Sequence, residues 1–504
     1  MSDLPAGWSS ALIGEVLAPL SDGRLIHQGW SPQCESGPAP TEEDWGVLKT
    51  TSIQDGQFLP EHNKRLPDAL VPRTLLEVRE GDLLITCAGP RIRCGVSCLV
   101  RHTRPRLIMS GKMYRMRPAS PSVLPEYIEA ALRTEAAKLA IDGMKTGTSE
   151  SGMNLTHARF AELSIPVAPT HEQRRIVAKL DALTARTARA RAYLERIERL
   201  APRYRLSLMR KAMLGELTDS WREAQVGLEP ASDLVSRTPA PPQGRGGREA
   251  TSERIEGTAA LAVNEPDRPL PTGWAWTPLL RIARQETGHT PSRGIAAYWD
   301  GDVPWIGIRD AGSHHGVVID ATLQTISEQG LANSSARLLP KGTVCLSRTA
   351  SVGYVTMMGR EMATSQDFAT WTCSAALDPE FLMYALMAEG DDIRAFGKGS
   401  THTTIYFPEI RALHISLPPL AEQQEIVRKI RAGLANVDRL ATEAAAARRL
   451  LDRLGQAVLA KAFRGELVPQ DPADEPASVL LDRIRTERAV APKPKRGRKS
   501  AVTA

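Results

Sequence analysis

The sequence predicts a mixed α+β protein built as an internal duplication. Two α/β domains in tandem each lead into a long helix, and the two helices pack as an antiparallel coiled coil with a pseudo-twofold repeat. Three observations predict this fold. Residues 163–217 repeat at 413–467 without a gap, with nineteen of these 55 positions identical. Each copy spaces its apolar residues alternately by three and four, which is typical of coiled-coil helices. Fainter repeats precede both copies, so whole domains are duplicated.

Composition and repeat boundaries divide the chain into six segments. The stretch between the repeats is rich in Pro, Gly, Arg and Ser and poor in aromatic residues, which is typical of a flexible linker. The last residues are basic and of low complexity, which predicts a disordered tail. In order, the segments are the first domain 1–162, the first helical segment 163–217, the linker 218–268, the second domain 269–412, the second helical segment 413–485 and the tail 486–504.

The two domains share a series of short phrases. A turn containing glycine followed by a short run of β-branched and apolar residues predicts a strand in each domain. A second strand, helical residues and a glycine-rich turn follow in both. The matched phrases are LPAGW with LPTGW, VREGDLLITCAG with LPKGTVCLSRTA, LIMSGKMYRMRP with EMATSQDFATWTC, and DGMKTGTS with GKGSTHT.

The limits of the helices are marked by local signals. Thr170 and Gln173 have the spacing of a capping box, which predicts the first helix start. Gly215 and Gly465 predict the two helix ends. Pro202 lacks an amide hydrogen, so we expect it to kink or break the first helix.

Each helix carries one narrow apolar seam. Either the two seams bury each other, or each helix docks on its own domain; the duplication favours mutual packing, which twofold symmetry makes antiparallel. Gly433 is a weak point of the second seam. The first seam comprises Ile176, Leu180, Leu183, Thr187, Ala190, Leu194 and Ile197, and the second comprises Ile426, Ile430, Val437, Leu440, Ala444, Ala447, Leu451, Leu454 and Val458.

Composition restricts the class of protein. A net charge of +6 and a pI near 9.0 permit a polyanionic partner. No apolar run approaches the ~18–20 residues that a membrane span needs, and the N-terminus lacks a secretory pattern, so we expect a cytoplasmic protein with no membrane partner. Six cysteines do not indicate a disulfide framework. The uneven spacing of Cys87, Cys94 and Cys98 favours ordinary thiols over a zinc site.

Motifs of catalytic chemistry are missing from the sequence. It contains no phosphate-binding loop, no amino-methyltransferase motif, no GxSxG and no HExxH. Asp68 and Glu77 with Arg79 resemble the acidic pair and lysine of metal-dependent nucleases, but arginine is a poor substitute for that lysine. A surface turn and a strand edge explain them better. His314 and His315 lack acidic or cysteine neighbours in the sequence, which favours a turn over a metal site.

Cationic and amide residues recur on turns of both domains. Such side chains read base edges in the major groove and neutralise phosphates; each is also explained as a solvated surface group. The DNA-binding candidates are Arg91, Arg93, Lys112, Arg115 and Lys145 in the first domain, and Arg309, Lys341, Arg348, Gln366, Lys398, Thr401 and His402 in the second.

Several phrases together resemble one family, the specificity subunits of type I restriction-modification enzymes. They are PTHEQRRIVAKLDAL and PPLAEQQEIVRKI, the helix exits KAMLGELTDSWRE and QAVLAKAFRGELV, the turns KTGTSESGMNLT and GKGSTHTTI, and EMATSQDF. The resemblance covers nearly the whole chain except the linker and the tail.

The resemblance implies a non-catalytic subunit whose two target-recognition domains each read one half of a bipartite, asymmetric site in double-stranded DNA. The helices form a spacer that sets the gap; ~30 residues at 1.5 Å span ~45 Å, or about a dozen base pairs. It also implies two adenine-methylating modification subunits and restriction/translocase subunits as partners. The chain itself needs no cofactor or metal; S-adenosylmethionine, ATP and Mg²⁺ belong to those partners.

The same resemblance assigns the spacer and the docking of subunits to residues of the repeated helices. These are Glu172, Gln173, Ile176, Leu180, Leu183, Leu194, Ile197, Glu422, Gln423, Ile426, Ile430, Val437, Leu451 and Leu454. Two other hypotheses stay open: a nuclease that uses Asp68 and Glu77, and a coiled-coil scaffold that does not bind DNA.

Overall fold

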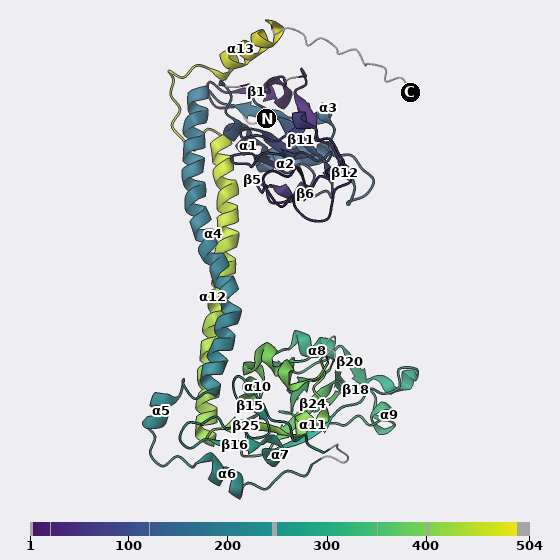
Figure 1. The fold of residues 1–504 in the computed structure, drawn as a ribbon. Helices are drawn as coiled ribbons and strands as arrows, with labels where there is room; N and C mark the ends of the chain where they lie inside the picture. The colour runs from purple at the N-terminus through teal and green to yellow at the C-terminus, as the bar shows by residue number, and fades with distance from the viewer. Residues whose placement is uncertain are drawn as a thin grey trace. The chain divides into compact units, whose positions relative to one another are not determined.

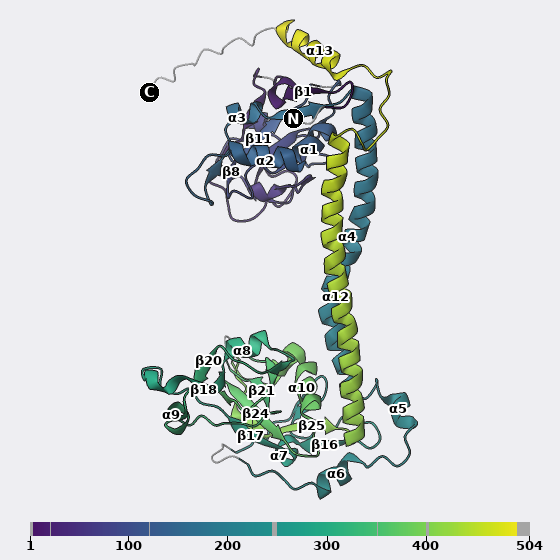
Figure 2. The same ribbon diagram turned by 180° about the vertical axis from the view of Figure 1, so that it is seen from behind.

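The computed structural model describes residues 4–20, 22–119, 121–243, 249–349, 351–399 and 403–490 (Figures 1 and 2). The chain forms two compact units. The first unit comprises the residues up to Tyr193 together with those from Ala446 onward, and the second unit is Leu194–Ala445. Each unit therefore combines one α/β domain with the beginning of its own long helix and the end of the other.

The first domain consists of small sheets around a four-stranded antiparallel sheet of order β2-β11-β7-β9. Helix α1 packs on β9, and β1 pairs with β13, the strand that leads into the first long helix. The elements are β1 (Ser9–Leu12), β2 (Ile26–Gln28), β3 (Gly46–Leu48), β4 (Ile53–Gln54), β5 (Gln57–Phe58), β6 (Asn63–Arg65), β7 (Leu83–Thr86), β8 (Ala88–Gly89), β9 (Ser97–Leu99), β10 (Leu107–Ile108), β11 (Met113–Met116), α1 (Pro125–Leu132), α2 (Glu135–Met144), β12 (Met153–Asn154), α3 (His157–Ala161) and β13 (Ser164–Val167).

The second domain has the same plan around a five-stranded sheet of order β17-β24-β21-β22-β19. Helix α10 packs on β21 and β22, and β25 leads into the second long helix. The elements are β16 (Ala275–Pro278), α7 (Leu279–Ile282), β17 (Ala283–Thr287), β18 (Trp299–Ile306), α8 (Ile308–Ser313), β19 (Val318–Ile319), β20 (Gln324–Ile326), α9 (Glu328–Ala332), β21 (Val344–Ser347), β22 (Val355–Met358), β23 (Ala363–Thr364), β24 (Phe368–Cys373), α10 (Pro379–Ala388), the 3-10 helix η5 (Gly390–Phe396), α11 (Phe407–Arg411) and β25 (Leu413–Leu417).

Two long helices, α4 (Thr170–Met213) and α12 (Leu420–Phe463), pack against each other and confirm the predicted pair. In the first unit Arg191 bonds Asp452 at 2.7 Å. In the second unit Arg205 pairs with Asp438, and Lys429 donates to the carbonyl oxygen of Leu217. The residue numbers rise along α4 as they fall along α12, so the segments are antiparallel.

The helix limits follow the predicted glycines. Gly215 and Gly465, each two residues beyond the last residue of its helix, have positive φ angles of 78° and 73°, which is a conformation that glycine adopts without strain. Helix α4 begins at Thr170 as predicted, but the hydroxyl group of Thr170 donates to the carbonyl of Ser122 instead of capping the helix. The helix also continues through Pro202 without a break.

The seam of α4 is as predicted, whereas that of α12 differs at two positions. Leu440 and Leu454 are each 49% exposed, and Ala441 and Gly455 are the less exposed neighbours. Apolar spacing alone does not show that small residues face the partner helix. Gly433 is such a residue, because a Cβ there would lie 2.4 Å from a methyl carbon of Leu208; it provides the space into which Leu208 packs.

The predicted linker holds regular structure: α5 (Asp219–Glu223), α6 (Ala231–Arg237), β14 (Ile255–Glu256) and β15 (Leu261–Val263). Strand β15 adds to the edge of β25. The buried Glu389 accepts the backbone N–H groups of Thr258, Ala259 and Leu261. These bonds explain why residues 255–263 form strands despite the linker-like composition of the segment.

A repeat absent from the predicted set explains the two short helices that follow the long ones. The phrase EPAS occurs at 229–232 and 475–478. The amide of Ala231 donates to the carbonyl of Gly273 at 2.9 Å, and that of Ala477 to Gly7 at 2.8 Å. The second phrase opens α13 (Ala477–Val490), so residues 486–490 of the predicted tail are helical; residues 491–504 lie outside the described part.

Candidate nucleic-acid interface

In the second domain, a polar loop lies where two neighbouring strands end. Strands β21 and β24 pair antiparallel, which places Arg348 beside residues 365–367. The amide of Arg348 donates to the carbonyl of Asp367 at 2.8 Å, and its Nη2 to the carbonyl of Gln366 at 3.0 Å. Its guanidinium lies 4.3 Å from the centre of the Phe407 ring, and burial lowers its pKa. Arg348 therefore supports the loop from below.

The side chains of this loop are held individually. The hydroxyl of Thr290 donates to Oε1 of Gln366 at 2.6 Å. Asp367 accepts hydrogen bonds from Thr349 and Ser365, at 2.6 and 3.0 Å. Gln366 itself is exposed. The loop thus presents one fixed amide to solvent.

The first domain has a loop at the same place, with different residues. The amide of Cys87 donates to the carbonyl of Lys112 at 2.9 Å, as Arg348 does to Asp367. The amide of Gly111 donates to the hydroxyl oxygen of Ser31 at 3.0 Å, and Gln28 donates to the carbonyl of Gly111. Lys112 is exposed. We call residues 110–112 and 365–367 the first and second recognition loops.

Both hydroxyl groups come from a short motif that the sequence comparison of the two halves missed. Gly29-Trp30-Ser31-Pro32 and Gly288-His289-Thr290-Pro291 share the pattern Gly-x-Ser/Thr-Pro. A Cβ on Gly288 would lie 1.9 Å from the carbonyl oxygen of Thr364, and one on Gly29 would lie 2.2 Å from that of Ser110. Glycine is therefore needed for each recognition loop to approach the motif. Searching both halves for this pattern would have found the motif.

The other first-domain candidates make internal contacts. Arg115 is buried and donates to the carbonyls of Leu75 and Glu77. Arg93 donates to the carbonyls of residues 50 and 53. Arg91 pairs with Asp142 and Glu150, at 2.9 and 3.0 Å, and Lys145 pairs with Asp142. Lys112 is thus the exposed candidate of the first recognition loop, whereas Arg93 and Arg115 brace the fold.

In the second domain, the remaining candidates are dispersed. Arg309 and Lys341 are exposed, on α8 and on the turn before β21. Lys398 pairs with Glu253 and Glu409, at 3.1 and 3.3 Å. Thr401 and His402 lie outside the described residues. The structure therefore brings together Arg348 and Gln366 of the predicted set.

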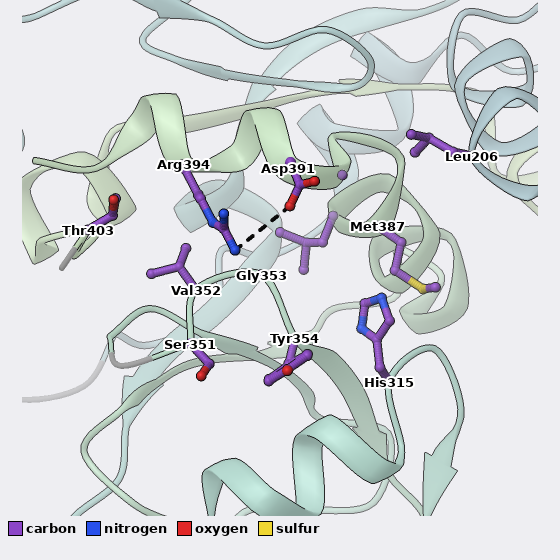
Figure 3. Close-up of a pocket in the computed structure, with 12 residues that line it drawn as sticks. Leu206, His315, Ser351, Val352, Gly353, Tyr354, Met387, Asp391, Arg394 and Thr403 are labelled. Carbon is purple, nitrogen blue, oxygen red and sulfur yellow. Dashed lines mark ion pairs between the residues drawn. The ribbon is translucent and has the colours of Figure 1, made fainter. Parts of the chain in front are cut away.

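A pocket of about 550 Å³ lies beside the turn that joins β21 to β22 (Figure 3). It is lined by residues 351–354, by α10 and η5, and by Leu206 of α4. Asp391 and Arg394 approach each other within it at 3.8 Å. Burial lowers the pKa of His315, whose Nδ1 accepts the amide of Val355. A pocket of about 410 Å³ occupies the matching place between residues 91–97 and α2, so the two domains share this hollow.

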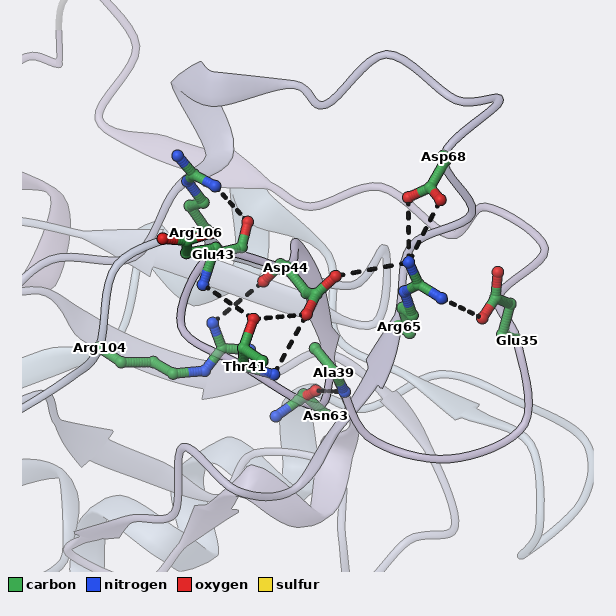
Figure 4. A network of polar contacts seen from close by, with 10 residues as sticks. All are labelled: Glu35, Ala39, Thr41, Glu43, Asp44, Asn63, Arg65, Asp68, Arg104 and Arg106. Carbon is green, nitrogen blue, oxygen red and sulfur yellow. Dashed lines mark hydrogen bonds and ion pairs between the residues drawn. The ribbon is translucent and has the colours of Figure 1, made fainter.

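The nuclease-like pair makes separate contacts. The carboxylate of Asp68 bonds Arg65 at 3.2 Å on the surface (Figure 4). Glu77 accepts the amide of Arg106 at 2.8 Å. Among the residues that the structure describes, no three His, Cys, Asp or Glu side chains gather as a metal site. These contacts support the interpretation of a surface turn and a strand edge.

The repeated Glu-Gln phrase is buried where each domain meets its helix. Trp8 donates from Nε1 to Glu172 at 3.0 Å, and Trp274 to Glu422 at 2.9 Å. Gln173 accepts the amide of Leu124 and donates to the carbonyl of Ala168. Gln423 makes the same pair of bonds, with Asp378 and Pro418. The repeated LPxGW and Glu-Gln phrases therefore clamp the domain to the helix, which gives these four side chains an internal role.

Comparisons with known proteins agree with this duplicated plan. The family model described as type I restriction modification DNA specificity domain matches residues 271–443. The EcoKI specificity subunit of Escherichia coli strain K12 is 23% identical over 519 aligned residues, which cover 99% of each chain. The EcoEI specificity subunit of Escherichia coli is 37% identical over 179 residues, 36% of this chain and 29% of that one.

Two solved structures share the fold. The HsdS subunit from Thermoanaerobacter tengcongensis has a TM-score of 0.52 and 21% identity, covering 92% of this chain and 98% of its own. A chain from a study of complex assembly and conformational transition of the type I R-M system has a TM-score of 0.61 and 21% identity, covering 93% and 100%. Residues 271–443 thus match the type I DNA specificity domain, and the whole chain is similar to specificity subunits of type I restriction enzymes.

Several of the predicted seam residues of the two long helices are internal. Ile176, Ile426, Ile430 and Val437 are buried. Other large apolar side chains of the same helices are exposed instead: Tyr193, Leu450 and Leu454 in the first unit, and Leu200, Tyr204 and Leu440 in the second. We call these six residues the exposed helix residues. None of the described helices has the length and apolar character needed to cross a membrane.

The Trp8–Glu172 contact predicts a dependence of stability on pH. Burial raises the pKa of Glu172, and Oε1 of Glu172 has no hydrogen-bond partner among the described residues. Because the folded state holds this proton more tightly than the unfolded state, the stability that this group contributes is present below pH ~4.5 and is lost as the pH rises through the folded pKa.

Replacing Glu172 with glutamine should therefore raise the urea unfolding midpoint above that of the wild-type chain, and by more at pH 7.5 than at pH 5. The reason is that the amide still accepts the Trp8 bond without a buried charge. The exposed Glu162, replaced with glutamine, serves as the control. An equal change in both variants at both pH values contradicts the interpretation.

Proposed function

We propose that the chain is the DNA-recognition subunit of a type I restriction-modification complex, and that each domain reads one half of a bipartite, asymmetric site. The observation that carries this proposal is the pair of recognition loops. Both are held by a Gly-x-Ser/Thr-Pro hydroxyl and by a strand-end amide at the same place. Their exposed residues differ, Lys112 in one loop and Gln366 in the other. Two equivalent heads with different side chains suit two different half-sites.

The long helices act as the spacer in this proposal. Each domain adjoins the start of its own long helix, and in this proposal the helix length sets the unread gap in the DNA. Each helix has 44 residues, and each residue adds 1.5 Å. The contacts that support a rigid spacer are the antiparallel ion pairs of both units and the packing of Leu208 at Gly433.

The partners in this proposal are two modification subunits, which methylate adenine with S-adenosylmethionine, and restriction/translocase subunits, which use ATP and Mg²⁺. Exposed tyrosine and leucine side chains are typical of docking surfaces. Two of the exposed helix residues of α4, Leu200 and Tyr204, correspond in the internal repeat to Leu450 and Leu454 of α12, which lie 250 residues later. Duplicated surfaces suit two copies of the same partner.

Binding to DNA in the assembled complex tests this function. The chain, co-expressed with its modification subunit, should bind duplex DNA with an affinity that falls steeply with salt, because phosphate contacts release counterions. An affinity for DNA that is absent or insensitive to salt supports the scaffold hypothesis instead. Mg²⁺-dependent cleavage by the isolated chain that is lost in Asp68→Ala supports the nuclease hypothesis.

A further inference from the structure

We propose that Gln366 reads an adenine in the half-site of the second domain, and that Thr290 is the positioning residue that fixes the amide. This inference rests on the proposed function and specifies it: it assigns one base of one half-site to one side chain. The contact is in the major groove, where adenine presents its N6 amino group and N7 at the same edge.

The backbone that carries Gln366 is held on both sides. The amide of Ser365 donates to the carbonyl of Ile306 at 3.1 Å, and Arg348 donates to the carbonyls of residues 366 and 367. The Phe407 ring beneath Arg348 and the bonds to the Asp367 carboxylate fix the rest of the loop. A side chain on such a loop loses little conformational freedom when it binds a base.

The amide of Gln366 is oriented and keeps its free hydrogen-bonding groups. The amide oxygen has two acceptor positions, and Thr290 occupies one of them. Within the described residues, the Nε2 group of Gln366 donates to no partner. One acceptor and one donor therefore remain side by side, which matches N6–H and N7 of adenine.

The first domain lacks this amide. Where Thr290 bonds the side chain of Gln366, the equivalent Ser31 accepts the backbone amide of Gly111, and glycine has no side chain to read a base. The hydroxyl group supports the recognition loop in both domains, whereas the reading amide belongs to the second domain alone. The adenine contact that this glutamine makes is therefore confined to the half-site of the second domain.

Single substitutions in the co-expressed complex test this inference. The chain and its modification subunit are expressed in a host without other adenine methylation, and methylated adenines are mapped across the genome. In Gln366→Ala, one adenine position of one half-site should become degenerate, with about a tenfold or larger loss of preference, while the other half-site stays unchanged. The unchanged half-site shows that the variant folds and assembles.

Thr290 is tested by two variants of different chemistry. Thr290→Val removes the hydroxyl and should relax the same position more weakly than Gln366→Ala. Thr290→Ser restores the hydroxyl and should restore the wild-type motif, which a role in packing of the methyl group alone does not predict. Gln329→Ala, a change of another exposed glutamine in the same unit, is the matched control and should leave the motif unchanged.

Three outcomes separate this inference from the proposed function. A bipartite wild-type motif that Gln366→Ala leaves unaltered refutes the reading role alone. A uniform loss of methylation in Gln366→Ala, without a change of base preference, also refutes it, because it indicates a phosphate contact. A wild-type motif that is not bipartite refutes the proposed function itself.

Discussion

Replacement of Glu422 with alanine is expected to destabilise the second unit by about 3–5 kcal/mol, the usual cost of removing one partner of a buried ion pair. The side chain of Glu422 is fully buried. It accepts hydrogen bonds from Trp274 at 2.9 Å, Thr218 at 2.7 Å and Arg222 at 2.9 Å. The substitution leaves the mostly buried Arg222 with the exposed Asp219 as its remaining ion-pair partner. Urea unfolding followed by tryptophan fluorescence measures the loss.

Two further variants identify the cause of that loss. Glu443→Ala changes an exposed glutamate of the same helix and should alter the unfolding free energy by less than about 0.5 kcal/mol. The double variant Glu422→Ala with Arg222→Ala should cost less than the sum of the single variants, because the two side chains interact directly. If Glu422→Ala costs no more than Glu443→Ala, the clamp does not stabilise the junction.

Lengthening the helix pair by one heptad should widen the gap in the recognised DNA by about three base pairs. Seven residues add ~10.5 Å, and each base pair adds ~3.4 Å. The pairs Arg191–Asp452 and Arg205–Asp438 fit one antiparallel register, in which each step forward along α4 is one step back along α12. Insertions after residues 199 and 443, both in the second unit, match each other in this register, so the pairing on both sides is kept.

The control for this prediction places the same seven residues between Pro239 and Ala240, which are both exposed and lie outside the long helices. That insertion should leave the gap unchanged. Mapping of methylated adenines reports the gap directly for both variants. An unchanged gap after the paired helix insertions means that the helices do not set the spacing.

The sequence predicted the parts of the fold that local patterns determine. The repeat at an offset of 250, the helix ends at Gly215 and Gly465, and the seam of α4 depend on neighbouring residues and were predicted correctly. Leu440 and Leu454 were placed on the seam wrongly. Their apolar character does not reveal that the smaller Ala441 and Gly455 allow the helices to approach.

Contacts between residues distant in sequence account for the remaining differences. Glu389 binds the amides of residues 258–261 across about 130 residues, so composition could not reveal that the predicted linker is ordered. Arg115 and Lys112 are both cations of one phrase. Arg115 lies on β11 among buried neighbours, whereas Lys112 lies on the loop before it. Only the paired strands show which of them faces solvent.

The measurement that tests the central claim most directly is a genome-wide map of methylated adenines made by the wild-type chain co-expressed with its modification subunit. Two recognition heads with different side chains predict a motif of two unlike parts with an unread gap between them and centres about a dozen base pairs apart, with one methylated adenine on each strand. A continuous palindromic motif contradicts the account.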